Sequence, residues 1–363
     1  MIQFLKKLNP FQKKQDMVVS MQITDELVRF VGLKNSSEGV FVYLFGEQYF
    51  SEGVMHEGKI INPASMTQTL SAIAKTYTLK KVHVVLPEEQ SFTFHSVVTK
   101  SDNSKEIQSI IEDHIVSYLK LHTKLPVKDL VCEYDVTGQE NDSYEISVWV
   151  TPRSIVDAYV EVFEQAGLEA VTLECGSQVV TNACIDASGK ETCLLVDFGH
   201  TKTHVAVTSE GAILHSATIP VGEYALTPKI QDYLNISRGE AEKIKHKYGL
   251  LRSHKEPTLL SELIHEILPL QDYLDRTYID WFLRPYKTKK ERNPITRVVL
   301  HGEGSHILGL RDHLSQATSL PTHYANVWRN VKLPKDRAPE VSFEDSLRYA
   351  TALSCALHVM KEE

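Results

Sequence analysis

Two short segments of the sequence follow one design, and this repetition constrains the fold more than any other feature. Residues 19–33 (VSMQITDELVRFVGL) and 195–207 (LVDFGHTKTHVAV) each place alternating apolar residues on both sides of a short polar turn. Such alternation is typical of a strand, a tight turn and a second strand. Because the two segments stand near the starts of two halves of the chain, they predict an internally duplicated α/β fold.

The second segment carries residues that suit a phosphate group. The alignment pairs three positions: Gln22 with Asp197, Thr24 with Gly199 and Val28 with Thr203. Turn amides and hydroxyls donate to phosphate oxygens, glycine allows a close backbone approach, and an aspartate holds Mg²⁺ directly or through water. We therefore expect a phosphate site from four residues, with the first also a metal ligand: Asp197, Gly199, Thr201 and Thr203. An ordinary Asp-x-Gly β-turn is the structural alternative.

The rest of the sequence predicts alternating strands and helices. Further strands are expected at 40–50, 81–86, 130–136, 144–150, 213–219 and 297–300. Helices are expected at 64–77, 101–119, 155–166, 238–248, 259–283 and 343–360. Asp102 or Ser104 can cap the second of these helices, and Gly167 closes the third.

Charge and composition exclude several classes of protein. The net charge of -8 argues against a general affinity for nucleic acid. The five cysteines form no Cys-x-x-Cys pair, so we expect neither a zinc ribbon nor a disulfide framework. We expect the protein to work in a reducing compartment. No apolar run reaches the roughly 18 to 20 residues that a membrane helix needs. The Gly-x-Ser-x-Gly motif of serine hydrolases is also absent from the sequence.

Two basic segments leave a choice open. Residues 1–16 carry four lysines between apolar residues, and residues 287–292 read KTKKER. Each lysine near an anionic membrane surface contributes about 1 kcal/mol to binding. The first segment therefore suits contact with an anionic membrane surface, and a disordered or locally packed leader is the alternative. The second suits contact with a membrane or an acidic partner, and a solvated loop is the alternative.

The motifs together resemble the actin-like ATPases. Residues 194–207 (LLVDFGHTKTHVAV) are similar to the second phosphate motif of that superfamily. Residues 298–314 (VVLHGEGSHILGLRDHL) resemble its adenosine motif, and 349–359 its closing helix. Residues 221–249 resemble a stretch that FtsA shares with the type IV pilus assembly protein PilM. Residues 86–98 and 125–136 favour the PilM family, because they are similar to its small inserted subdomain in type and order.

The resemblance implies an α/β fold of two actin-like, RNase H-like duplicated lobes with a small inserted SHS2-type subdomain. It implies the following division: a tail at 1–16, a first lobe at 17–86 and 151–190, the inserted subdomain at 87–150, and a second lobe at 191–363, of which 221–295 is a smaller subdomain. It covers nearly all of residues 17–358.

The resemblance also implies a function. PilM-like proteins are cytoplasmic scaffolds of type IV pilus or related secretion machines, peripheral at the inner membrane. They hold the cytoplasmic N-terminal tail of a PilN-like inner-membrane protein in a groove beside the inserted subdomain, and they work with other pilus assembly proteins. The alternatives are an FtsA-like division scaffold and an actin-like ATPase that hydrolyses its nucleotide.

For cofactors, the resemblance implies ATP and Mg²⁺. The phosphate and metal residues would be those named above. Adenosine would face three residues of the 298–314 motif: Gly302, Gly304 and Ser305. Glu242 and Lys245 would face the purine or the ribose.

The chain departs from the family pattern where the chemistry is concentrated. Gln22 and Thr24 stand where the family has an aspartate and a glycine, and Glu223 and Glu303 replace glycines. A missing charge beside Mg²⁺ weakens phosphoryl transfer more than binding. We therefore expect a nucleotide-binding or vestigial site with little or no ATPase activity. Arg29 matches a usual family cation, for which phosphate contact and surface exposure are both open.

Three further pairs of residues suggest chemistry less strongly: His200 with His204, His301 with His306, and Cys184 with Cys193. A metal ion at the first pair would lack an evident third ligand. The second pair is expected to be solvated in a loop. A reducing compartment disfavours a disulfide in the third.

Overall fold

The computed structural model describes residues 3–4, 17–100, 106–185, 191–251, 257–283, 293–333 and 340–362. Most of the basic tail, the KTKKER segment and the predicted caps Asp102 and Ser104 lie outside the described residues. Among the helices that are described, none combines the length and the apolarity needed to cross a membrane.

The first lobe is built on a five-stranded sheet in the order β11-β7-β2-β3-β4. Strands β2, β3 and β4 form an antiparallel meander, and β7 and β11 continue the sheet in parallel on the other side of β2. The strands span Val18–Ile23 (β2), Leu27–Asn35 (β3), Val40–Tyr49 (β4), Lys81–Leu86 (β7) and Glu169–Cys175 (β11). Helices α1 (Pro63–Tyr77) and α3 (Arg153–Gln165) pack against each other beside it, and β5 (Met55–His56) and β6 (Lys59–Ile60) form a small hairpin.

The second lobe repeats this topology. Strands β12, β13 and β14 form an antiparallel meander, and β15 and β16 extend it in parallel, in the order β14-β13-β12-β15-β16. The strands span Thr192–Phe198 (β12), Thr203–Ser209 (β13), Ala212–Ile219 (β14), Ile295–His301 (β15) and Thr322–Tyr324 (β16). The predicted duplication is confirmed, and the aligned segments 19–33 and 195–207 are the first hairpin of each lobe.

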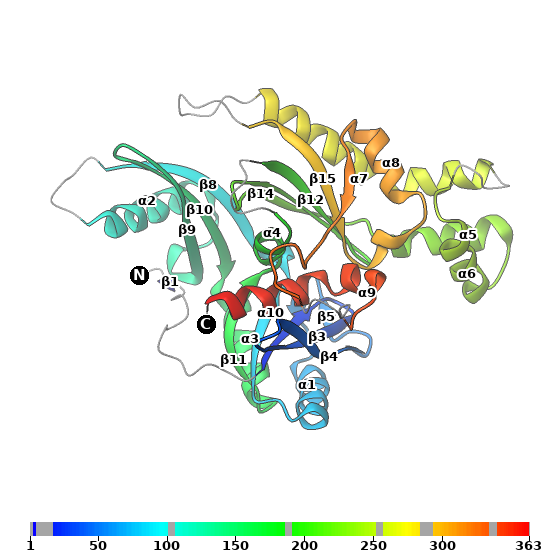
Figure 1. The fold of residues 1–363 in the computed structure, drawn as a ribbon, viewed down its shortest axis with the longest axis horizontal. Coiled ribbons are helices and arrows are strands. Elements are labelled where there is room, and N and C mark those ends of the chain that lie inside the picture. Colours follow the sequence, from blue (N-terminus) through cyan, green and yellow to red (C-terminus); the bar gives the residue numbers. More distant parts are fainter. Residues whose placement is uncertain are drawn as a thin grey trace.

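Four strands and one helix lie at the far side of the second sheet (Figure 1). Strands β8 (Phe92–Thr99), β10 (Ser143–Pro152), β9 (Leu130–Glu140) and β1 (Gln3–Phe4) continue the sheet beyond β14, so that one nine-stranded sheet results. Helix α2 (Ile107–His122) covers them with a buried stripe, because Ile111, Ile115 and Leu119 recur at helical spacing. The short turn η2 (Val127–Asp129) precedes β9.

Helices of the second lobe gather at the opposite end of the molecule (Figure 1). They are α5 (Leu226–Leu234), α6 (Arg238–Tyr248), α7 (Pro257–Leu283) and α8 (Leu310–Thr318). Helix α6 has the predicted bounds because its ends are marked in the sequence. Ser237 and Glu240 form a capping box at its start, and Gly249, with φ of 48°, ends it.

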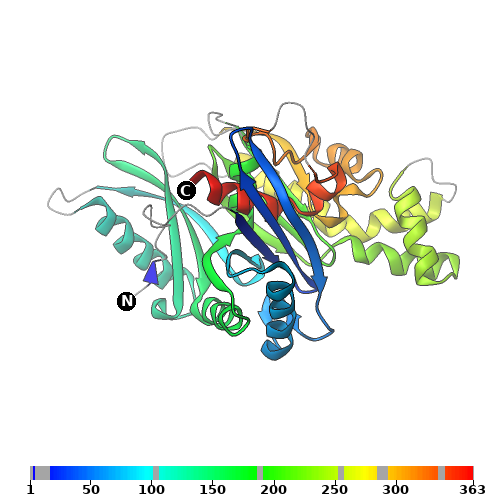
Figure 2. The same cartoon turned by 60° about the horizontal axis from the view of Figure 1, so that its bottom comes forward.

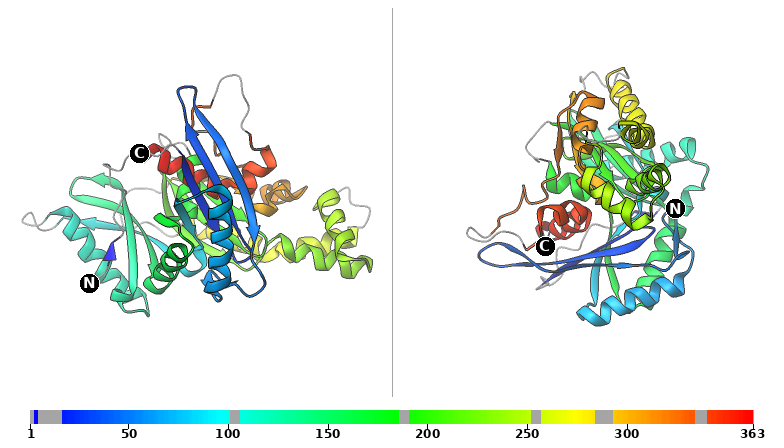
Figure 3. Two further views of the ribbon diagram at one scale, coloured as in Figure 1. Left: turned by 90° about the horizontal axis from the view of Figure 1, so that it is seen from below. Right: turned by 90° about the vertical axis from the view of Figure 1, so that its right-hand side faces the viewer.

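Two helices are exchanged between the lobes. Helix α10 (Ala350–Glu362) follows the second sheet in sequence but packs on β2, β3 and β7 of the first, where Ser20 Oγ donates to the Ala352 carbonyl at 2.5 Å. Helix α4 (Gly176–Cys184) follows the first sheet but contacts β13 and β14 of the second. Figures 2 and 3 show α10 between the first sheet and the second lobe. The two helices pack on each other and close a core that both lobes share.

The closing helix differs from its prediction. One helix was expected at 343–360, but the structure has α9 (Phe343–Arg348) and then α10, separated by Tyr349. The backbone of Tyr349 has φ of -96° and ψ of 11°, outside the helical range, and its side chain is buried against Phe45. Anchoring of this ring breaks the helix where the sequence shows no proline or glycine.

Candidate functional site

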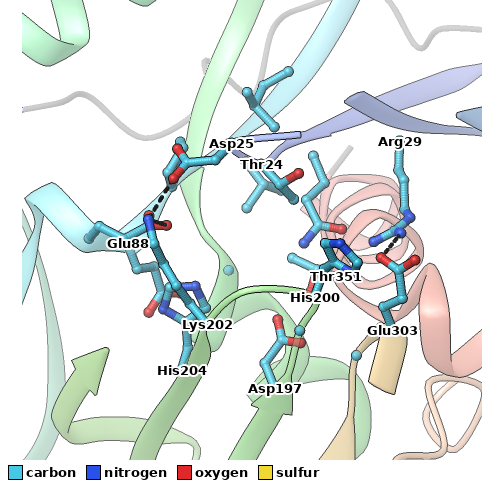
Figure 4. A pocket seen from close by; sticks show the side chains of 18 of the residues that line it. Thr24, Asp25, Arg29, Glu88, Asp197, His200, Lys202, His204, Glu303 and Thr351 are labelled. Atoms are coloured by element: carbon cyan, nitrogen blue, oxygen red, sulfur yellow. Dashed lines mark hydrogen bonds and ion pairs between the residues drawn. The ribbon is translucent and has the colours of Figure 1, made fainter. Parts of the chain in front are cut away.

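The first hairpin turns of the two lobes face each other across a narrow cleft (Figure 4). The turn at 24–26 comes from β2 and β3, and the turn at 199–202 comes from β12 and β13. Two short turns complete the lining: η1 (Glu88–Gln90) after β7, and the start of η4 (Glu303–His306) after β15. The free volume of the cleft is about 80 Å³, whereas pockets for small molecules usually measure about 300 to 1,000 Å³.

Only part of the sequence-predicted site lies in this cleft. Asp197, Gly199, Thr201 and Gly302 line it. The Thr203 hydroxyl is buried and donates to the Val221 carbonyl at 2.6 Å. The Ser305 hydroxyl is likewise buried and donates to the carbonyl of Gly302 at 2.7 Å. Neither hydroxyl is directed at a ligand in this arrangement, and the roles expected for them stay predictions.

The glycines of the adenosine-type turn have a reason in packing. Gly302 has φ of 95°, and a Cβ there would lie 2.1 Å from Asp197 Oδ1. A Cβ on Gly304 would lie 2.6 Å from the Phe198 ring. The end of β12 therefore requires glycine at both positions, whether or not adenosine binds.

The two residues expected at the purine or ribose, Glu242 and Lys245, do not line the cleft and belong to a cluster of titratable groups beside it. The Lys245 side chain is almost fully buried, and its Nζ contacts Glu223 at 2.5 Å and Glu242 at 2.7 Å. Glu223 also accepts from His200 Nδ1 at 2.8 Å, and Glu242 accepts from the Thr227 hydroxyl at 2.7 Å. We call these four charged groups (Glu223, Glu242, Lys245 and His200) the lysine cluster.

The lysine cluster shifts the protonation of its own members. Burial alone would raise the pKa of Glu223, but the hydrogen bonds from His200 and Lys245 and the charge of Lys245 lower it to about 2. The hydrogen bond to Glu223 raises the pKa of His200, against the effect of burial. Glu223, which replaces a family glycine, is thus a structural anion of this chain.

We expect Glu223 to make the free energy of unfolding depend on pH in the acidic range. A carboxylate with a lowered pKa stabilises the fold above its usual pKa of 4.5 and loses that contribution as the pH falls towards 2. His200 acts in the opposite sense, since its contribution is present below its usual pKa of 6.5 and lost as the pH rises through the raised value. The shift of Glu223 corresponds to about 3 kcal/mol.

Urea denaturation of the wild type and Glu223→Gln at a series of pH values measures this effect. Between pH 5 and pH 2 we expect the wild type to lose about 3 kcal/mol more than the variant. Equal losses in the two proteins would contradict the assignment.

On one side of the cleft, a lysine joins the two lobes. Lys202 Nζ lies 2.6 Å from Asp25 Oδ2 and 3.1 Å from Glu89 Oε1, and we call this group the lysine bridge. The two carboxylates raise the pKa of Lys202 although burial lowers it. Beside the bridge, the Thr201 hydroxyl donates to Glu26 at 2.7 Å.

On the other side, four charges alternate in a closed ring: Arg29, Glu303, Arg348 and Glu47. Arg29 contacts Glu303 at 2.5 Å and Glu47 at 3.1 Å, and Arg348 contacts Glu47 at 2.9 Å and Glu303 at 3.7 Å. Arg29 and Glu47 belong to the first lobe and the other two residues to the second. We call this set the charge ring. Arg29 is 4% exposed, which excludes the surface cation, one of the two alternatives left open for it.

We tested whether these residues fit Mg²⁺ and a nucleoside triphosphate. Three cations line the cleft, and all three are engaged with carboxylates: Arg29, Lys202 and Arg348. Six carboxylates line it: Asp25, Glu26, Glu88, Glu89, Asp197 and Glu303. A polyphosphate would meet this excess of negative charge in a space too small for it. The cleft as the structure has it does not fit the nucleotide.

Two polar side chains in the cleft wall lack hydrogen bonds among the described residues. Gln22 Oε1 is buried without a donor. Both ring nitrogens of His301 lack a hydrogen-bond partner, although Nδ1 lies 3.7 Å from Asp197 Oδ1. Burial lowers the pKa of His301, which is 2% exposed. The prediction of a solvated His301 is therefore wrong, because this residue is the last of β15 and lies inside.

The histidine pair expected at low weight as a metal site is not brought together. His200 bonds to Glu223, and His204 bonds to the Thr218 hydroxyl at 2.9 Å. Ligand atoms of His200, Glu223 and Glu303 do lie within 4.8 Å of one another. Each of these three groups already has a partner in the lysine cluster or the charge ring.

Sequence reasoning missed the acidic side of the cleft. It did not select Asp25, Glu26, Glu89 or Lys202 as site residues. The polar Thr-Asp-Glu turn after the first strand was visible in the sequence, but its partners across the cleft, Thr201 and Lys202, lie more than 100 residues away. The repetition of the hairpin was the one available signal, since it places the two turns at matching positions.

A second, larger hollow lies beside the inserted strands. Its volume is about 880 Å³, and it is bounded by β9, β10, α3, β11 and the β13–β14 turn. Lysine and arginine are absent from the described lining. Seven carboxylates line the hollow: Glu133, Asp135, Asp157, Glu161, Glu164, Glu174 and Glu210. The Trp149 indole also lines it, and its buried N–H has no hydrogen-bond partner among the described residues. We call this hollow the acidic groove.

The duplicated sheets, the exchanged helices and the cleft between the lobes define an actin-like protein. A family model for the type IV pilus assembly protein PilM matches residues 20–360, and the chain belongs to that family. No curated protein matches the sequence.

Solved structures show the same fold. The chain is similar to a "PilM-PilN type IV pilus biogenesis complex" structure at 16% identity, with a TM-score of 0.77 and coverage of 94% of this chain and 98% of that chain. It is also similar to MreB 5 of Spiroplasma citri bound to AMPPNP, at 14% identity, a TM-score of 0.54 and 96% coverage of both chains. The ethanolamine utilization protein EutJ from Carboxydothermus hydrogenoformans matches at 15% identity, a TM-score of 0.52, and 96% and 91% coverage.

Proposed function

We propose that this protein is a scaffold of a type IV pilus or related secretion machine. In this proposal it lies at the cytoplasmic face of the inner membrane and holds the cytoplasmic N-terminal tail of a PilN-like membrane protein. Family membership and the likeness to a structure titled as a PilM–PilN complex support it. The division into a first lobe at 17–86 and 151–190, an inserted subdomain at 87–150 and a second lobe at 191–363 is part of the same proposal.

The observation that carries the proposal is the acidic groove. Its volume suits several residues of extended peptide, and it lies between the inserted strands and α3 of the first lobe. The unpartnered Trp149 N–H offers a donor for a peptide carbonyl, because a buried donor without a partner is costly. Strand β9 pairs with β1 only at Val131 and Cys132, so much of its outer edge has no strand neighbour in the described structure. An extended tail can add to such an edge.

The lining of the groove predicts the charge of the tail. The described lining holds seven carboxylates and neither lysine nor arginine, which favours a tail with basic side chains, since opposite charges steer association and set specificity. The proposal includes little or no ATPase activity, because the cleft residues do not fit the nucleotide.

A pull-down from membranes tests the partner directly. We expect the wild type to recover a PilN-like inner-membrane protein together with other pilus components. Recovery of division proteins without any pilus component would contradict the proposal and favour an FtsA-like scaffold.

Variants of the groove test the site. We expect Glu161→Lys to weaken tail binding about tenfold or more, since it places a cation among the carboxylates that attract the tail. Trp149→Phe keeps the ring and removes the N–H, and it should also weaken binding. The matched control is Glu262→Lys, a charge reversal on exposed α7 away from the groove. Calorimetry with a synthetic tail peptide measures the affinity of each variant. Unchanged affinity in both groove variants would exclude this site.

A further inference from the structure

We propose that the cleft between the lobes is an ion-pair latch that holds the lobes together in the absence of nucleotide. The latch consists of the lysine bridge on one side and the charge ring on the other. This inference concerns the cleft alone and does not depend on the proposal for the acidic groove. It assigns to this chain's own side chains the place where the sequence predicted a phosphate group.

The two hairpin turns are in direct contact. Lys202 of the second lobe reaches Asp25 and Glu89, and Thr201 donates its hydroxyl to Glu26. Figure 4 shows Lys202 directed at Asp25. The turn that was predicted to present hydroxyls to phosphate presents the Thr201 hydroxyl to a carboxylate instead. The space between the turns is therefore filled by the protein.

The charge ring joins the lobes on the other side of the cleft. Glu303 stands where the family has glycine, and its carboxylate meets the guanidinium of Arg29 from the other lobe (Figure 4). Arg348 and Glu47 make a second contact between the lobes, at 2.9 Å. Two positive and two negative groups balance one another, so the ring needs no counterion. The glutamate that departs from the family pattern thus has a defined partner in this chain.

Most of these contacts are shielded from solvent. The side chains are 4% exposed at Arg29, 16% at Glu303, 18% at Lys202 and 11% at Glu89. Partly buried pairs in networks are stronger than isolated surface pairs and less screened by salt. Nearby carboxylates raise the pKa of Arg29, although burial lowers it, so this group remains charged. The lobes are therefore joined by ion pairs whose side chains are largely shielded from water.

The carboxylates of the latch would compete with a nucleotide for the same two cations. A nucleotide could occupy this cleft only after Lys202 and Arg29 had exchanged their carboxylate partners for phosphate. The released carboxylates would then lie beside the phosphate charges, which is unfavourable on both counts. The latch and the nucleotide are therefore alternatives, and the structure favours the latch.

The experiment measures binding and lobe separation on the full chain. All five cysteines are buried, so cysteines introduced at exposed Gln68 on α1 and Lys243 on α6 can be labelled with spin probes. Pulsed electron resonance then gives the distance between the lobes, with and without millimolar Mg-ATP. Calorimetry on the unlabelled chain with the same ligand measures binding.

For the wild type we expect no binding heat, and one short distance that Mg-ATP leaves unchanged. For Lys202→Gln combined with Glu303→Gln we expect a shift to longer or broader distances. The matched control is Glu191→Gln, which breaks a partly buried pair with Arg297 inside the second lobe. That control should keep the wild-type distance. Cooperative urea unfolding shows that each variant is folded, and Glu303→Gln alone serves if the double variant is not.

Three results would overturn the latch. The first is Mg-ATP binding by the wild type with a dissociation constant well below about 1 mM. The second is a wild type whose lobes are apart until Mg-ATP is added. The third is a folded double variant with the wild-type distance, because the lobes would then be held by other contacts.

Discussion

Lys245→Met is expected to lower the free energy of unfolding by about 3 to 5 kcal/mol, the cost of removing one partner from a buried ion pair. Lys245 is 1% exposed and contacts Glu223 and Glu242. Without it, Glu223 keeps only His200 as a partner while its carboxylate stays buried. The methionine fills much of the same space, so the loss reports the charge and not a cavity.

The matched control for this variant is Lys229→Met. Lys229 also contacts two glutamates, Glu262 and Glu266, but at an exposed surface. Its replacement should leave stability nearly unchanged. Urea denaturation at pH 7 measures both variants. A loss below about 1 kcal/mol for Lys245→Met, the usual value of an exposed pair, would mean that the lysine cluster relaxes towards solvent.

Gly302→Ala is the second substitution with a large expected effect. Gly302 has φ of 95° and ψ of 173°, a backbone region that is essentially restricted to glycine. A Cβ there would lie 2.1 Å from Asp197 Oδ1 and 2.8 Å from the Phe198 carbonyl oxygen. Backbone strain and overlap together should cost about 3 kcal/mol or more. The same change would displace Glu303, the next residue, and weaken the charge ring.

Gly239→Ala is the control for this second variant. Gly239 lies in the first turn of α6, and a Cβ there meets no atom within 4 Å. Alanine favours a helix over glycine, so this variant should be as stable as the wild type or up to about 1 kcal/mol more stable. Thermal and urea unfolding compare the two variants. A Gly302→Ala protein as stable as the control would show that the turn can move away from β12.

The sequence predicted those parts of the fold that depend on neighbouring residues. The alternation around Gln22 and Asp197 predicted both hairpins, and the helix expected at 238–248 has the same bounds as α6. The break at Tyr349 was missed, because it depends on the contact of its ring with Phe45, about 300 residues earlier. Local patterns carry no information on such a contact.

The same limit separates the predicted cleft from the observed one. Gly199 and Gly302 could be selected because turns need glycine locally, and both line the cleft. The sequence showed Glu303 only as the replacement of a family glycine, whereas its partner is Arg29, 274 residues away in sequence. A charge can be read from the sequence, but its partner across two lobes cannot. The chemistry of the cleft is decided by that pairing.

The exchange of α4 and α10 has a mechanical consequence. Gly176, Ser177 and Thr351, at the starts of these two helices, line the cleft. Further along, Gln178 and Asn182 on α4 and His358 on α10 line the acidic groove, and Asn182 and His358 are within hydrogen-bond distance. The two helices thus connect the two sites. We expect a rotation of the lobes that widens the cleft to move one wall of the groove as well, and a peptide bound in the groove to influence the cleft in turn.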